Sequence, residues 1–354
     1  MELLHKPDFE ETRKRWRAFW AGEIIDRPCV NVLAPKDGMV VPPHPRGLQK
    51  PGDDYRNLAE QYDRWAAAMH FGGEAIPNLR PNFGPDVFAA FFGAKLEYSQ
   101  ESGETSWAVP CIEDWSFTDT CFDEPRGKWW RGVLDSLRAI SEFGEGRFMV
   151  SVPDLHSNMD CLSAMRGPQR LCEDLFDFPE AVDRAMLNVR GVYPQVYEAI
   201  YEAGRMQTVG TISWLQCYCE GRFTATQCDF IYMIGPEHFR RWVLPALEEE
   251  AAYLDHTVYH LDGPAALVHL DDILAIEGLD VIQWVPGAGQ LAQIGWLDLL
   301  HRIQDAGKGL YLYGSPDEIK VFHKELRPER VIYDTWAGSP AEADALLKWL
   351  TVNT

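Results

Sequence analysis

The sequence of 354 residues lacks the features that would assign it to a membrane or a secretory class. It contains no apolar run that approaches the roughly 20 residues needed to span a bilayer. Its first segment, MELLHKPDFEETRKRWRAFW, lacks the basic and then apolar order of a secretory signal. We therefore expect a cytoplasmic protein with no membrane partner.

Basic residues are scarce compared with acidic ones. The chain carries 33 Lys and Arg against 54 Asp and Glu, so its formal net charge is −21. A surface this acidic repels phosphate backbones, which excludes nucleic acid as an expected partner. The simplest consequence of the charge is solubility.

The sequence also lacks the spacings of common binding motifs. No GxGxxG or GxxxxGK[ST] stands at a predicted strand–helix turn, which removes the usual nucleotide-binding loop. The eight cysteines are scattered without a CxxC pair, and we expect no disulfide framework in a long chain without a signal peptide. Cys217, Cys219 and Cys228 form the one local cluster. One functional thiol among them is a hypothesis that competes with ordinary core packing.

What is present is a regular alternation of short apolar runs and amphipathic segments. The predicted strands are 29–35, 147–155, 206–215, 256–263, 279–285, 307–314 and 330–335. Each run is short and rich in β-branched or aromatic residues, as in a buried parallel strand. The predicted helices are 179–204, 236–256, 296–307 and 339–350. We expect Pro194 and Pro245 to bend or interrupt two of these helices.

Strands that alternate with helices predict an α/β fold with a parallel sheet. The number of strands and the chain length favour a (β/α)8 TIM barrel over an open, doubly wound sheet, with the eighth strand before residue 145. Residues 35–60 and 72–128 are rich in Pro, Gly and aromatics, and they predict long N-terminal loop insertions. Because no repeat or low-complexity linker divides the chain, we expect a single catalytic domain over 1–354.

Ionisable residues stand at the ends of the predicted strands, where barrel enzymes carry their catalytic groups. His260 and Asp262 are two residues apart, so their side chains point to the same side of one strand and can converge on a ligand or a metal. Asp154 and His156 repeat this spacing on another strand. Two His and two Asp in one cleft favour acid–base chemistry or a metal site. In the competing interpretation, the aspartates cap helices and the histidines are buried.

Aromatic and polar residues near the same strand ends predict a wall for an aromatic or planar substrate. Core packing is the competing interpretation for the aromatic members. The predicted substrate-binding residues are Asn82, Trp214, Cys217, Phe230, Gln283, Trp284 and Tyr313.

Three segments carry a resemblance to a known family. They are WAAAMHFGGEAIPNLRPNFGPDVFAAFFG (65–93), residues 152–182, which begin VPDLHSNMDCLSAMRG, and residues 224–290, which begin TATQCDFIYMIGPEHF. With them, the chain from about residue 60 onward resembles the uroporphyrinogen decarboxylase superfamily. The resemblance implies a (β/α)8 barrel. It also implies either decarboxylation of a tetrapyrrole without a cofactor, or zinc-dependent methyl transfer between a corrinoid protein and a thiol.

The resemblance places His260-Leu261-Asp262 where the zinc methyltransferases have a His-x-Cys pair, so Asp replaces Cys. The later zinc-binding Cys of those enzymes has no counterpart near Tyr313. A metal site of His260, Asp262 and Cys228 remains open, because zinc accepts N, O and S donors. The arginine-rich segment of the decarboxylases is missing from AGEIIDRPCVNVLAP (21–35).

Three functions follow as alternatives. The first is a methyltransferase or demethylase for a small methylated compound, with a corrinoid (a corrinoid protein or cobalamin) or a thiol as acceptor. In it a Zn²⁺ ion is bound, and Asp154 or His156 handles protons. The second is a cofactor-free decarboxylase or lyase. The third is a non-catalytic protein that binds a corrinoid or tetrapyrrole. Aromatic residues of 72–130 also make a homodimer an expectation.

Overall fold

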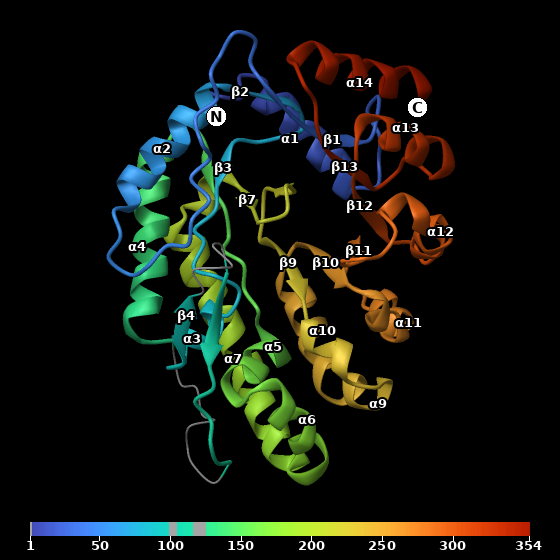
Figure 1. Cartoon of the computed structure of the whole chain (residues 1–354). Coiled ribbons are helices and arrows are strands. Elements are labelled where there is room, and N and C mark those ends of the chain that lie inside the picture. Colours follow the sequence, from blue (N-terminus) through green and yellow to red (C-terminus); the bar gives the residue numbers. More distant parts are fainter. Residues whose placement is uncertain (1, 99–104, 116–124) are drawn as a thin grey trace.

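The computed structural model describes residues 2–98, 105–115 and 125–354, and its centre is a sheet of seven strands (Figure 1). Six of these strands are parallel, and β2 lies antiparallel to β1 at one edge. In spatial order the strands are β2 (Met69–Gly73), β1 (Cys29–Pro35), β13 (Val331–Trp336), β12 (Gly309–Tyr313), β11 (Val281–Val285), β10 (His256–Asp262) and β9 (Phe223–Gln227). The parallel arrangement confirms the predicted α/β fold.

Helices follow the strands and cover the outer side of the curved sheet, as Figure 1 shows for α11 to α14. The main helices of this half are α10 (Leu244–Tyr253), α11 (Leu270–Leu274), α12 (Leu297–Asp305), α13 (Pro316–Glu325) and α14 (Pro340–Asn353). Shorter helical turns are η2 (Asp229–Met233), α9 (Pro236–His238), η3 (Phe239–Val243), η4 (Pro264–His269) and η5 (Gln293–Trp296). The π-helical segment η3 lies just before Pro245, whose missing N–H disturbs the helix predicted over 236–256.

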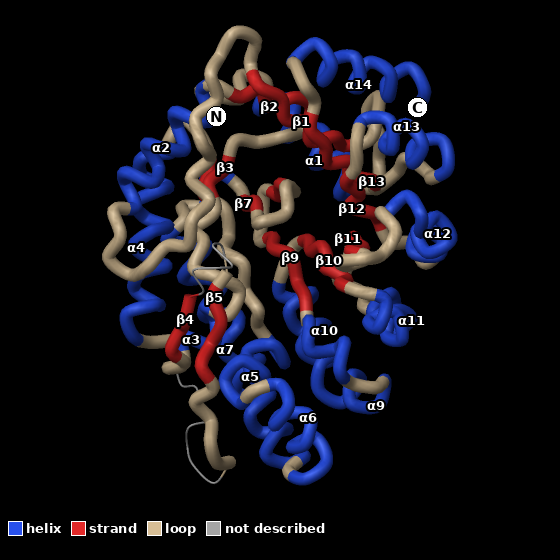
Figure 2. Tube along the Cα trace, viewed as in Figure 1, coloured by secondary structure: helices blue, strands red, loops and turns tan. Residues whose placement is uncertain are grey.

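The other half of the chain is more helical. Its helices are α1 (Phe9–Trp20), α2 (Tyr55–Ala67), α3 (Val87–Phe91), α4 (Gly127–Gly144), α5 (Asn158–Arg166), α6 (Pro168–Asp177), α7 (Pro179–Ala203) and α8 (Met206–Val209). Its short strands are β3 (Asn78–Leu79), β4 (Lys95–Tyr98), β5 (Ser106–Val109), β6 (Met149–Val150), β7 (Thr211–Ile212) and β8 (Tyr218–Cys219). The pairs β4–β5 and β7–β8 are antiparallel, whereas β3–β6 is parallel (Figure 2). Pro194 lies within α7, which continues through it as one helix.

Three of the sequence interpretations were wrong about where strands lie. Within 147–155 only Met149–Val150 is a strand, so Asp154 and His156 lie in the loop beyond it and not on a strand. The segment 206–215 begins with α8, and only Thr211–Ile212 is a strand. The segment TATQ (224–227), which is absent from the predicted strands, belongs to β9, which pairs with β10. Every residue of β9 is buried, and the hydroxyl of Thr257 donates to the carbonyl of Thr224. After Phe223, small Thr and Ala residues form this strand, with little of the hydrophobic signal that marks the others.

Side chains alternate between two hydrophobic cores across the sheet. Leu261, Trp284 and Leu312 point outward to the helices. The inner core contains residues near the first positions of the strands, Val258, Val281 and Ile332. It also contains Phe9 and Trp16 of α1. Helix α1 therefore covers the amino ends of these strands and leaves their carboxyl ends uncovered by it.

Along the described residues, no continuous ladder of hydrogen bonds links β9 back to β2, so the central sheet has two edges. The parallel pair β3–β6 supplies a strand before residue 145, in the region where an eighth was expected. A closed (β/α)8 barrel thus stays a prediction. No described helix is both long and apolar enough to cross a membrane.

Candidate functional site

The carboxyl ends of the parallel strands bring polar side chains to the inner side of the sheet. His260 on β10 pairs in register with Gln283 on β11, and Gln283 pairs with Tyr311 on β12. Because side chains alternate, Asp262 and Tyr313 project to the same side two residues further along. The predicted convergence of His260 and Asp262 on one side of β10 follows from this register.

A first group of possible metal ligands consists of Asp229, His260 and Asp262. One ligand atom from each of the three lies within 4.8 Å of the others. Asp229 is the first residue of η2, directly beyond β9, and its side chain is 54% exposed. Nδ1 of His260 lies 2.6 Å from Oε1 of Gln283. Since an amide oxygen only accepts, Nδ1 carries the hydrogen and Nε2 keeps its lone pair for a ligand.

A second group shares Asp229 with the first and adds His156 and Asp160. Nδ1 of His156 lies 3.6 Å from Asp160 and 3.9 Å from Asp229, and its Nε2 lies 3.9 Å from Asp154. Asp160, in the first turn of α5, accepts the backbone N–H groups of Asp229 and Phe230 at 2.8 Å each. These two bonds fix η2 against α5, so they place Asp229 between the two histidines.

Burial and the neighbouring charges together shift the pKa values of the site. Burial lowers the pKa of His156, but the carboxylates around it outweigh burial and hold that pKa above its ordinary value. Burial raises the pKa of Asp160 to about 6, and it also raises the pKa values of Asp86 and Asp262. The charged neighbours that shift these three carboxyl groups are histidines and other aspartates. A cation is therefore the ligand that this site favours.

Glu250 of α10 lies beneath the loop that presents His156. Its side chain is buried, and Oε1 accepts hydrogen bonds from the Ser157 hydroxyl at 2.6 Å and the Asn158 amide at 3.3 Å. The Asn158 amide also donates to the carbonyl of Gln227, whose own side chain donates to Asp154 at 2.7 Å. Burial raises the pKa of Glu250 to about 7. This network holds the loop 154–158 against β9.

Several predicted site residues lie elsewhere. Phe230 and Trp284 are buried in the outer core, and Cys217 is buried in the inner core. Trp284 follows Gln283 directly and so faces the opposite side of β11. Asn82 holds a loop, because it donates to the carbonyl of Arg46 and accepts the N–H of Gly84.

Cys228 is not a member of either ligand group found among the described residues. Its buried thiol donates to Oδ1 of Asp160 at 3.5 Å, and burial holds its pKa well above the ordinary value. Trp214 does reach the site, because its ring lies edge-on to His260 with 5.1 Å between the ring centroids. Tyr313 remains 41% exposed at the end of β12.

Asp229 and Asp160 were missed as site residues. Had 223–227 been interpreted as a strand, Asp229 would have stood two residues beyond its end, where catalytic groups gather. Asp160 stands four residues after His156, a spacing typical of one helical face. In the structure, however, α5 begins only at Asn158, so the chain turn before the helix brings the two together.

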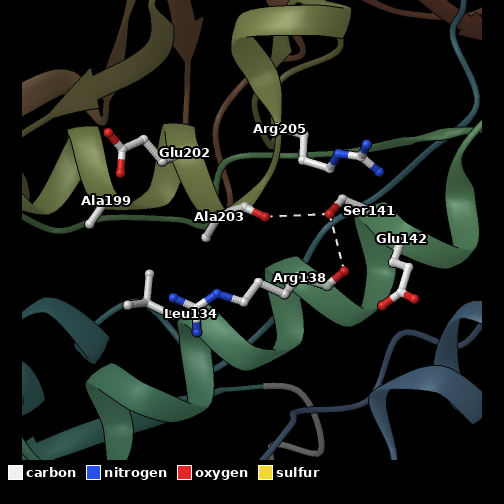
Figure 3. Close-up of a pocket in the computed structure, with 8 residues that line it drawn as sticks. All are labelled: Leu134, Arg138, Ser141, Glu142, Ala199, Glu202, Ala203 and Arg205. Atoms are coloured by element: carbon white, nitrogen blue, oxygen red, sulfur yellow. Dashed lines mark hydrogen bonds between the residues drawn. The ribbon is translucent and has the colours of Figure 1, made fainter.

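A surface cavity of about 490 Å³ lies away from this site, between α4 and the end of α7 (Figure 3). The Ser141 hydroxyl there donates to the carbonyls of Arg138 and Ala203. The carboxyl ends of these helices lead into β6 and α8, so the cavity lies toward the amino ends of the strands. Its charged lining is Arg138, Glu142, Glu202 and Arg205, without the histidines and aspartates that gather at the carboxyl ends.

Comparison with known proteins gives a likeness in structure. No protein-family model matches the chain, and no curated protein matches it in sequence. The structure is similar to that of a methyltransferase from Methanosarcina mazei, with a TM-score of 0.62. The similarity covers 96% of this chain and 98% of that chain, at 14% sequence identity. At this identity the likeness shows a shared fold.

Proposed function

We propose that the chain is a metal-dependent methyltransferase or demethylase for a small methylated compound. The observation that carries the proposal is the group of Asp229, His260 and Asp262 at the strand ends, with His260 oriented by Gln283. The similar fold of a protein named as a methyltransferase supports it. The proposal includes membership of the uroporphyrinogen decarboxylase superfamily, a single catalytic domain over 1–354 and a (β/α)8 barrel.

The donor set fits a divalent ion such as Zn²⁺. One imidazole nitrogen and two carboxylate oxygens are ligand types that zinc accepts, and a catalytic zinc keeps a fourth position open. Donors around a tetrahedral ion with bonds of 2.0–2.1 Å stand about 3.4 Å apart. The exposed side chain of Asp229 can close the remaining distance by rotation. When bound, the ion supplies a Lewis acid that activates the methyl acceptor.

The protein's own residues have separate tasks in this proposal. Gln283 fixes the ring of His260, and Asp160 fixes Asp229 through the backbone of η2. His156 holds a proton at the edge of the site, with Asp154 on its other nitrogen. Cys228 has no place among the ligands, since its thiol faces Asp160. The proposed methyl acceptor is a thiol or a corrinoid, the latter either free or on a partner protein.

Elemental analysis of the purified protein tests the proposal. We expect about one zinc per chain, retained through dialysis and lost with activity in excess chelator. The variant His260→Ala should lose the metal, whereas His301→Ala, on α12, should keep it. Wild-type protein that carries no metal and is insensitive to chelator would contradict the proposal and favour a cofactor-free lyase.

A further inference from the structure

The carboxyl ends of the strands carry more negative charge than one divalent ion can neutralise. Asp86, Asp154, Asp160, Asp229 and Asp262 gather around His156 and His260. With a divalent ion and one imidazolium in place, up to two negative charges remain in excess. The two segments outside the described residues, 99–104 and 116–124, contain no Lys or Arg in their sequence. The site thus repels an anionic substrate and attracts a second cation.

Aromatic rings stand beside the same carboxylates. Tyr232, 57% exposed, lies against Gly263, since a Cβ at Gly263 would come within 2.9 Å of its ring. Tyr313 ends β12, and by the strand register its ring projects to the same side of the sheet as Asp262 on β10, the next strand but one. Trp214 lies against His260. Aromatic faces next to carboxylates are the combination that recognises an organic ammonium ion, because a cation is attracted to the face of a ring.

We propose that the methyl donor is an organic cation that carries an N-methylated ammonium group. This inference rests on the proposed methyl-transfer function and names its substrate class. Tyr232 and Tyr313 contact the methyl groups through their rings, and the excess carboxylates balance the positive charge. A small inorganic cation uses none of these aromatic contacts, which is why the rings favour the organic cation.

The reaction balances with a thiolate as the methyl acceptor. The sulfur attacks the methyl carbon, the S–C bond forms as the C–N bond breaks, and the electron pair of that bond stays on nitrogen. The positive ammonium group and the negative thiolate become a neutral amine and a neutral thioether.

Calorimetric titration of the zinc-loaded protein tests the inference. The probes are choline and 3,3-dimethylbutan-1-ol, which has the same shape without the charge. We expect choline to bind at least about tenfold more tightly than the neutral alcohol. Tyr313→Leu should weaken choline binding about 3- to 30-fold, the range of a cation–π contact, whereas Tyr313→Phe should retain it. Tyr201→Leu is the matched control, because Tyr201 lies beside Arg222 at the amino end of β9.

The titration separates this inference from the proposed function. Choline and the alcohol binding equally, or neither binding, to protein that holds its zinc would overturn the inference and leave the metal site standing. Displacement of choline by a second equivalent of zinc would overturn it in favour of a second metal ion. A protein that takes up no zinc contradicts the proposed function itself.

Discussion

Nδ1 of His260 and Oε1 of Gln283 lie 2.6 Å apart on neighbouring parallel strands. The contact determines which imidazole nitrogen is available, since in the neutral ring Nδ1 donates to Gln283 and the lone pair is on Nε2. Partners of this kind fix both the tautomer and the orientation of a ligating histidine. The position of Gln283 therefore links the register of β10 and β11 to the chemistry of the site.

Replacement of Gln283 should weaken metal binding without removing a ligand. We expect Gln283→Leu to lower zinc affinity about 10- to 100-fold, the effect typical of losing such a partner. Gln283→Glu keeps an acceptor for Nδ1 and should keep affinity within a few fold of wild type. Competition against a zinc-binding dye measures both variants. Equal affinities of the Leu variant and wild type would show that the contact does not orient a ligand.

Removal of a carboxylate ligand should have a larger effect than removal of Gln283. We expect Asp229→Asn to lose more than about 100-fold in zinc affinity, because a neutral amide is a poor ligand for a divalent ion. Asp317→Asn is the control, since Asp317 is 92% exposed and pairs with Lys320 on the surface. The same dye competition gives the affinities. A normal zinc affinity in Asp229→Asn would assign the metal to other residues.

Glu250 should make the protein less stable as pH rises. The pKa of its carboxyl group is about 7 in the folded protein against an ordinary value of 4.5, so the folded state holds the proton more tightly. This tighter proton binding stabilises the folded state fully below about pH 4.5. The stabilisation is lost as pH rises through 7, which lowers the free energy of unfolding by up to about 3 kcal/mol. We expect Glu250→Gln, which keeps an acceptor for Ser157, to lack this loss.

Urea unfolding of both proteins at pH 5 and pH 8 measures the effect. From pH 5 to pH 8, the free energy of unfolding of Glu250→Gln should rise relative to that of wild type by up to about 3 kcal/mol. The pKa values of Asp160 and Asp334 are also raised, to about 6. Both proteins contain these groups, so their effect on stability cancels in the difference between wild type and variant. An unchanged difference between the two proteins would mean that Glu250 titrates normally.

Trp284 should matter for stability and leave metal binding unchanged. Its side chain is fully buried and lies against Trp296 in the outer core, with 5.0 Å between the ring centroids. We expect Trp284→Ala to lower the free energy of unfolding by about 3–5 kcal/mol. Tyr313→Ala, at a half-exposed position, should lower it far less. Denaturant curves give both values, and a loss of zinc affinity in folded Trp284→Ala would place this ring at the site after all.

The sequence predicted the α/β class and the later strands because their apolar runs and helix boundaries are strong local signals. It also predicted that His260 and Asp262 share one side of a strand, since that depends only on the period of two. It did not predict β9, whose Thr and Ala residues carry little hydrophobic signal. Asp229 was missed with it, because its role depends on where that strand ends.

The aromatic residues show a second limit of prediction from the sequence. Trp284 and Trp214 look equivalent in the sequence, yet one belongs to the outer core and the other contacts His260. One position of register decides the side of the sheet on which Trp284 lies. Trp214 reaches its place through the loop between β7 and β8, which no periodic pattern describes. Long-range packing of this kind cannot be inferred from local spacing.

Crystals of the zinc-loaded protein, measured with X-rays at the zinc absorption edge, test the central claim most directly. We expect one anomalous peak per chain, about 2.0–2.2 Å from Nε2 of His260 and from carboxylate oxygens of Asp229 and Asp262. Crystals of Asp229→Asn should lose that peak. An absence of anomalous signal between these three residues at saturating zinc, with the protein folded as described, would contradict the metal site and the function proposed from it.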